Sequence, residues 1–152
     1  MTQARPFTTT KPPPIESLGK AYFTPLMSPL PVVTRLPQPA PNADTITEYL
    51  RIQAAGGPQL VTTGQEGYFW QCSLILHSYA PADQEVLAEE NMTTAVGWGA
   101  NAQGTTITTI KSQVPWYCSY STGQVGTKII DPSVALVRYR GLATWRIMGR
   151  PM

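Results

Sequence analysis

Residues 68–79 read Tyr-Phe-Trp-Gln-Cys-Ser-Leu-Ile-Leu-His-Ser-Tyr, and this stretch decides the fold. Large apolar side chains alternate with smaller or more polar ones, which is the pattern of a strand with one buried face. His77 falls on the opposite, more polar face, together with Gln71 and Ser73. The residues expected on the buried face are Tyr68, Trp70, Cys72, Leu74 and Leu76.

A helix is expected directly after this strand, over residues 81–96. Pro81 suits its first position, and Asp83 suits its first turn, where a carboxylate interacts favourably with the helix dipole. Gly97 and Gly99 are expected to end it. Its buried stripe would comprise Val86, Leu87, Met92, Ala95 and Val96.

Three shorter elements are expected before this strand. The first is a helix over residues 14–27, which Pro25 should end or kink. Strands over residues 31–36 and 46–54 follow, separated by a loop at 37–44. The expected buried stripe of the helix is Ile15, Leu18, Tyr22 and Leu26, and the apolar positions of the second strand are Ile46, Leu50, Ile52 and Ala54.

Residues 103–122 and 134–148 are expected to form two or three further strands, with a turn at Asp131-Pro132 between them. Gly141 is expected to mark a bulge or bend in the second of these stretches. So few helices must pack on a mostly antiparallel or mixed sheet, which predicts an α+β fold of about five to six strands flanked by two helices. The expected inward residues are Trp116, Cys118, Tyr120, Val137, Tyr139, Ala143, Trp145 and Ile147.

The prolines divide the chain unevenly, because ten of the 15 lie within the first 41 residues. Residues 1–13 are therefore predicted to be a Pro/Thr-rich extended N-terminal arm, followed by one α+β domain over residues 14–152. Such an arm either folds onto its own domain or lies on a neighbouring subunit.

Charged residues are scarce, at 13% of the 152 residues, against about 25% in an average soluble domain. Charged residues are depleted at the cores of protein interfaces. A neutral, polar surface therefore suits a subunit whose surface is largely covered by neighbouring subunits. The net charge of +2 argues against a strongly basic DNA-binding face. No apolar run approaches the roughly 18 residues of a membrane helix, so no membrane association is expected.

The few charges are segregated along the chain. Residues 43–100 carry seven carboxylates against one arginine, and residues 101–152 carry six basic residues against one aspartate. Complementary patches of this kind favour head-to-tail association, although ordinary surface scatter is the alternative. The candidate inter-subunit or channel residues are Arg138, Arg140, Arg146, Glu85, Glu89 and Glu90.

The motifs of common enzymes are missing from the sequence, including G-x-S-x-G, H-E-x-x-H, the Walker loop and C-x-x-C. His77 is the only histidine, so a multi-histidine metal site is excluded. Cys72 and Cys118 both occupy inward strand positions and are expected to be buried free thiols. The sequence therefore predicts no catalytic, cofactor-binding or metal-binding residues, and no enzymatic activity.

Several short words in the chain resemble a known family. They are Val32-Val33-Thr34-Arg35 after the first helix, Leu50-Arg51-Ile52-Gln53 before Gly56-Gly57, the strand 72–80 that leads into the acidic helix, and Asp131-Pro132 before the strand 136–140. Over roughly residues 14–149 the chain resembles the tail terminator proteins of long, non-contractile-tailed bacteriophages, especially the actinobacteriophage type.

This resemblance implies a structural virion protein of the tail or neck, assembled in the host cytoplasm and without catalytic residues. It implies a homohexameric ring that caps the tail tube, ends tail polymerisation and docks the head–tail connector or stopper protein. Genomic DNA would pass through its channel without sequence-specific binding. The alternatives are another neck or tail ring component, such as a stopper, connector or tail-tube subunit, and a cellular module that binds a small ligand among Tyr68, Trp70 and Trp116.

Overall fold

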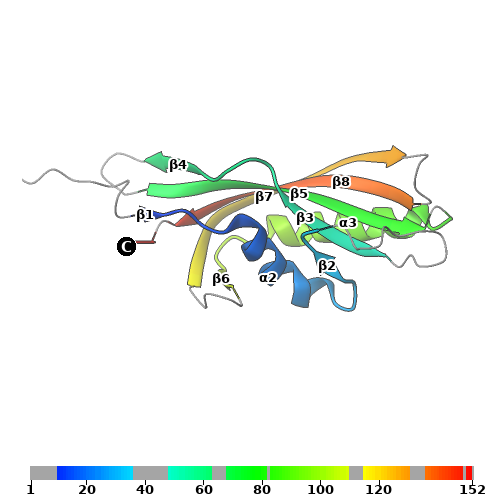
Figure 1. The fold of residues 1–152 in the computed structure, drawn as a ribbon, viewed down its shortest axis with the longest axis horizontal. Coiled ribbons are helices and arrows are strands. Elements are labelled where there is room, and N and C mark those ends of the chain that lie inside the picture. The colour runs from blue at the N-terminus through cyan, green and yellow to red at the C-terminus, as the bar shows by residue number, and fades with distance from the viewer. Residues whose placement is uncertain are drawn as a thin grey trace, which may run out of the picture.

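The computed structural model describes residues 10–35, 48–62, 68–81, 83–109, 115–130, 136–148 and 150–151. Two helices and a long twisted sheet make up its body (Figure 1). The loop expected at 37–44 and the turn expected at Asp131-Pro132 lie outside the described residues. In chain order the elements are β1 (Thr10–Lys11), α2 (Ile15–Met27), β2 (Val32–Val33), β3 (Tyr49–Ala54), β4 (Gln59–Thr62), β5 (Tyr68–Pro81), α3 (Glu85–Ala100), β6 (Thr106–Thr108), β7 (Pro115–Ile130), β8 (Leu136–Met148) and β9 (Arg150–Pro151).

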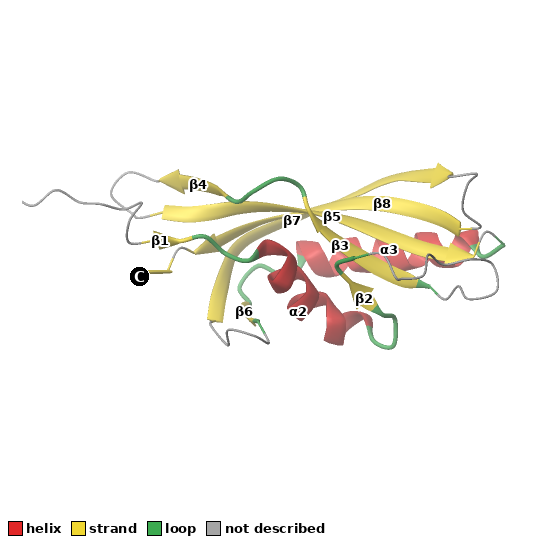
Figure 2. Cartoon of the chain, in the orientation of Figure 1, coloured by secondary structure: helices red, strands yellow, loops and turns green. Residues whose placement is uncertain are grey.

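The main sheet follows the order β2-β3-β5-β8-β7-β6, with β4 also paired to β5. The β2–β3 pair is parallel, whereas every other pair in this sheet is antiparallel. Both helices lie against one face of the sheet, which leaves the opposite face without a helix (Figure 2). The predicted α+β class, with a mixed sheet and two helices, is confirmed, and we refer to the uncovered side as the helix-free face.

The core fills the space between the sheet and the two helices. Trp145 of β8 lies at its centre, with its ring 6.0 Å from that of Phe23 and 5.2 Å from that of Tyr22, both on α2. Burying side chains of this size stabilises the fold by about 1.5–3 kcal/mol each. The fully buried positions include the predicted residues Leu50, Ile52, Cys72, Leu74, Leu76, Cys118, Ala143, Trp145 and Ile147.

Helix α2 begins directly after Pro14, as predicted, and continues two residues past Pro25 to Met27. Its buried stripe differs from the predicted one in the second half of the helix. Phe23 and Met27 are buried there, whereas the predicted Tyr22 and Leu26 are only half-buried.

Helix α3 is displaced along the chain from its predicted position. Pro81 is the last residue of β5, and the helix runs from Glu85 to Ala100, so the predicted stop at the glycines is wrong. Gly99 lets the helix pack closely on the sheet, because a Cβ atom there would lie 3.0 Å from the Cβ of Ala143 on β8, a tight contact. Val86, predicted to be buried, is 66% exposed, and Ala88 faces the core instead.

Strand β7 extends to Ile130, well beyond the predicted end at residue 122. A register shift between Cys118 and Tyr120 reverses the alternation, so Tyr120 is 44% exposed rather than inward as predicted. A second irregularity lies opposite Gly141, between Val125 and Lys128. The bulge therefore belongs to β7, while Gly141 allows α3 to approach closely: a Cβ there would lie 2.5 Å from the Sδ atom of Met92.

The two chain ends meet outside the main sheet. Thr10–Lys11 pairs antiparallel with Arg150–Pro151, so this part of the predicted arm folds onto its own domain. Two other differences concern short strands. Strand β4 was not predicted, and the strand expected over residues 31–36 is limited to Val32–Val33.

Candidate functional site

The helix-free face of the sheet carries the clearest concentration of charge. Leu50, Ile52 and Leu76 are buried beneath the helices, so the alternating residues between and beside them point to the other side. Arg51 of β3, His77 of β5 and Arg140 of β8 occupy directly paired positions on three neighbouring strands. They form one row across the helix-free face.

A second row lies beside the first. Tyr49 is paired with Tyr79, which is paired with Arg138. The two tyrosine rings stack at 4.6 Å, and Arg138 lies 5.9 Å from the centroid of the Tyr79 ring. Its Nη1 atom donates a hydrogen bond of 3.4 Å to the Tyr79 hydroxyl. We call Arg51, His77, Arg138 and Arg140 the basic cluster.

Several polar atoms in these two rows are buried without a hydrogen-bond partner among the described residues. They are the Tyr49 hydroxyl, His77 Nδ1, and the Nε atoms of Arg51 and Arg138. Tyr49 is only 4% exposed and His77 only 7%. Buried polar groups normally find partners, so this concentration of unpaired ones suggests that something else binds here.

Burial lowers the pKa of His77 from 6.5 to about 4, with further lowering by Arg138, Arg51 and Arg140. The imidazole is therefore neutral at pH 7. The hydroxyl of Tyr49 has its pKa raised to about 12, chiefly by burial. Both effects show that these groups are shielded from water, and the lowered pKa of His77 shows that the cluster disfavours additional positive charge.

Arg146, the third arginine predicted on this strand, is separate from the basic cluster. It lies six residues from Arg140, which is about 20 Å along an extended strand. Its guanidinium is 4.9 Å from the ring centroids of both Phe69 and Tyr120. Arg146 therefore already has aromatic partners within its own chain.

The predicted acidic residues lie on the other side of the molecule. Helix α3 packs on the sheet through Ala88, Met92, Ala95 and Val96, so its opposite side faces away from the sheet. That side carries Glu89 and Glu90, both exposed, next to Val86. An open depression of ≈ 540 Å³ lies among these residues and two threonines. We call Val86, Glu89, Glu90 and Thr93 the acidic stripe.

Glu85, the third predicted acid, is engaged within its own chain. Its Oε1 atom accepts hydrogen bonds from Lys128 Nζ at 2.6 Å and from the Tyr139 hydroxyl at 3.2 Å. The hydrogen bond from Lys128 lowers the pKa of Glu85. Glu85 therefore differs from Glu89 and Glu90, because its carboxylate is already bound within its own chain.

Sequence reasoning found Arg138 and Arg140 but missed their partners Arg51, His77 and the two tyrosines. The alternation of residues 49–54 does place Arg51 opposite Leu50 and Ile52. What it could not show is that β3 and β8 flank β5, which brings residues 51 and 140 into one row.

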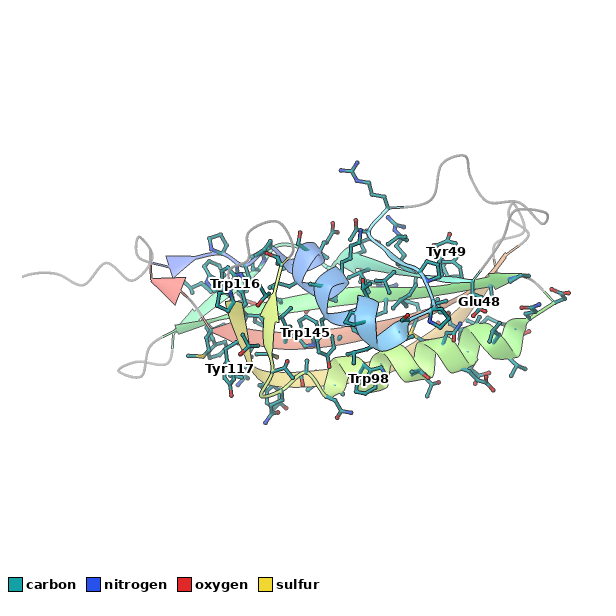
Figure 3. The ribbon with its side chains drawn as sticks, turned by 90° about the horizontal axis from the view of Figure 1, so that it is seen from below. Glu48, Tyr49, Trp98, Trp116, Tyr117 and Trp145 are labelled. Carbon is teal, nitrogen blue, oxygen red and sulfur yellow. The ribbon has the colours of Figure 1, made fainter. Side chains whose placement is uncertain are left out.

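The alternative aromatic ligand pocket does not form as expected. Trp116 is 3% exposed and belongs to the core, and Trp70 packs against that core. The side chain of Tyr68 is outside the described residues. Figure 3 shows Trp116 near one end of the sheet and Tyr49 near the other.

Another hollow lies beside the helices. A groove of ≈ 560 Å³ runs between the end of α2, the turn at Ser28–Pro31 and α3. Glu48 lines it and accepts a 2.6 Å hydrogen bond from Asn91, so its carboxylate is also engaged.

Within the described ranges, no three His, Cys, Asp or Glu side chains converge as metal ligands would. Neither does any helix there combine the length and apolarity needed to cross a bilayer. Cys72 and Cys118 are free and buried, as predicted.

Comparison with solved structures gives a similarity at low sequence identity. No family model matches the chain, and no curated protein matches it. Among solved structures, a chain of the structure titled "Virion of native gene transfer agent (GTA) particle" is similar, with a TM-score of 0.43 and 11% identity, over 80% of this chain and 81% of that chain.

Proposed function

We propose that this chain is a structural virion protein that forms a closed ring and acts as a tail terminator. In this role the ring caps the last layer of tail-tube subunits and ends tail polymerisation. Its other side docks the head–tail connector or stopper protein, and genomic DNA passes through the channel.

The order of elements supports this proposal. The sequence words that resemble tail terminators fall on β2, on β3, and on β5 where it leads into the acidic helix α3. The described residues also lack a cluster of potential metal ligands, and Glu85 is held by Lys128 rather than poised for acid–base chemistry.

The observation that carries the proposal is the separation of charge between two sides of one thin molecule. Among the described residues, the helix-free face holds Arg51, Arg138, Arg140 and Arg146, and no carboxylate faces them. The acidic stripe lies beyond the helix layer, on the far side of the sheet. A single copy cannot neutralise its own charges, whereas copies arranged head to tail can. Heterologous contacts of this type close into a ring when the rotation allows it.

A ring also explains how termination can work. One side of the ring matches the docking surface of the tube, while the other side differs from it, so no further tube subunit can add. The scarcity of charge fits a subunit with neighbours on both flanks, above and below.

Native mass spectrometry of the purified full-length chain, with negative-stain imaging, tests the proposal. We expect one closed species of six copies with a central channel. Added to polymerising tail-tube subunits of the same particle, this ring should stop elongation. A chain that remains monomeric at tens of micromolar would overturn the proposal, and filaments would favour the tail-tube alternative.

A further inference from the structure

We propose that the basic cluster on the helix-free face is the docking site for the acidic stripe of a second copy of this chain. Arg51, Arg138 and Arg140 would bind the carboxylates of Glu89 and Glu90, with His77 and Tyr49 lining the contact. This inference rests on the proposed ring and specifies which surfaces form its subunit contact.

An anion would stabilise the cluster electrostatically. Arg51 and Arg140 lie on either side of the neutral His77 in one row, two strand spacings or about 10 Å apart, so their positive charges repel each other at a site shielded from water. None of the described carboxylates faces them from β3, β5, β7 or β8. Glu16 bonds to the backbone of Ala54 and Glu48 to Asn91, both away from this cluster.

The arginines give the site its chemistry. Arg51 and Arg138 are half-buried, and their Nε atoms and the Tyr49 hydroxyl, which lack partners among the described residues, lie buried beneath the surface of the site. Arginine donates in a planar fork that matches a carboxylate, so the outer ends of these guanidinium groups are suited to bind Glu side chains. Arg140 is exposed and can make the first contact.

The acidic stripe has a spacing that fits this face. Val86 and Glu90 are four residues apart on one side of α3, which is about 6 Å along the helix. On the sheet, the row beside Arg51–His77–Arg140 contains the half-buried Ile75 and Leu142, and adjacent rows on one face are about 7 Å apart. Val86, which is 66% exposed, can therefore cover the apolar row while Glu90 reaches the arginines.

A second copy is favoured over DNA as the occupant. If the arginines bound the phosphates of DNA, the exposed Glu89 and Glu90 would remain uncompensated. Strong phosphate contacts would also hold the genome in a channel through which it must move. Pairing with a second copy neutralises a basic cluster and an acidic stripe at once. In such a pair each copy keeps one free surface, and the next copy can bind there.

Two charge-reversed chains test the contact. The first carries Arg140→Glu, and the second carries Glu89→Arg with Glu90→Arg. Each should fail to form the ring when alone, with association weakened about tenfold or more. Their intact surfaces match each other, and so do their reversed surfaces, so a 1:1 mixture should give rings in which the two chains alternate, as seen by native mass spectrometry. Combining all three substitutions in one chain should restore the ring.

Arg146→Glu is the matched control, because Arg146 lies on the same strand and face but between two aromatic rings of its own chain. It should leave the ring intact. Circular dichroism and the urea midpoint confirm that each variant is folded, and Arg51→Gln provides a milder substitution in the cluster.

Three results would overturn the inference. One is a ring that persists in both charge-reversed chains, which leaves the proposed function standing but places its contact elsewhere. Another is an intact ring whose Arg140→Glu variant loses binding to a labelled 30-base-pair duplex, which assigns the face to DNA. A wild-type chain that is monomeric would overturn both the contact and the proposed function.

Discussion

The indole N–H of Trp145, near the C-terminal end of β8, donates a hydrogen bond of 2.9 Å to the carbonyl oxygen of Gly99 in the last turn of α3. This buried bond fixes the helix over the middle of the sheet. Replacing Trp145 with Phe keeps an aromatic ring beside Phe23 but removes the donor, and the smaller ring leaves space unfilled. We expect a loss of about 1–3 kcal/mol in the free energy of unfolding, measured in urea.

Trp98→Phe serves as the comparison for this substitution. Trp98 also belongs to α3 but is 37% exposed. Its replacement should change stability by no more than about 0.5 kcal/mol. Equal losses in the free energy of unfolding would show that the hydrogen bond to Gly99 adds no measurable stability.

Gly123 and Gly97 should respond in opposite ways to the same substitution. A Cβ atom on Gly123 would lie 2.6 Å from the carbonyl oxygen of Val96, a backbone atom that cannot move aside easily. Gly123→Ala should therefore destabilise by about 1–3 kcal/mol. A Cβ on Gly97 meets nothing within 4 Å, so Gly97→Ala should stabilise the helix by up to about 1 kcal/mol. Melting temperatures that shift in the same direction would contradict this reading of the helix–sheet contact.

The core strand 68–79 and the glycines of α3 show which features could be predicted from the sequence and which could not. Alternation over residues 68–79 correctly assigned Cys72, Leu74 and Leu76 to the core, because a period of two is a local property. The end of α3 was misplaced because Gly97 and Gly99 resemble a helix stop in sequence. Only the close packing against Ala143 shows why a small residue suits this position within the helix.

Only half of the basic cluster could be predicted from the sequence, for a related reason. Arg138 and Arg140 stood out as alternate residues of one strand, while Arg51 and His77 belong to strands that lie far away in sequence. The bulge that turns Tyr120 outward had no sequence signal either, since neither glycine nor proline lies between Cys118 and Tyr120.

His77 should make the free energy of unfolding depend on pH between 6.5 and about 4, where few other types of side chain change protonation. The unfolded chain binds a proton as the pH falls through 6.5, whereas the folded chain does so only near a pKa of about 4. Stability is therefore unaffected by this group above pH 6.5 and declines as the pH falls from 6.5 towards 4. Urea midpoints at pH 7, 6 and 5 measure the effect, and His77→Gln should remove it.

Because His77 is the only histidine, the proton resonances of its ring can be followed without ambiguity. Titration near 6.5 in the folded chain would contradict the burial of this imidazole beside three arginines.

The two cysteines should be unreactive in the folded chain. Burial raises the pKa of Cys72 to about 12 and that of Cys118 to about 11, so almost no thiolate is present at pH 8. A chromogenic disulfide reagent should modify neither thiol within minutes under native conditions, and both after unfolding in urea. Rapid modification of either thiol in the native chain would show that this part of the core opens readily.

The pairing of Thr10–Lys11 with Arg150–Pro151 places both ends of the described chain at one tip of an elongated molecule (Figure 1). A short linker can therefore join them, and new termini can be opened in a surface loop without redirecting any core strand. It also means that a label attached at Thr10 or at Arg150 reports from the same tip. In the ring proposed above, either label would therefore mark the position of this one tip of the subunit.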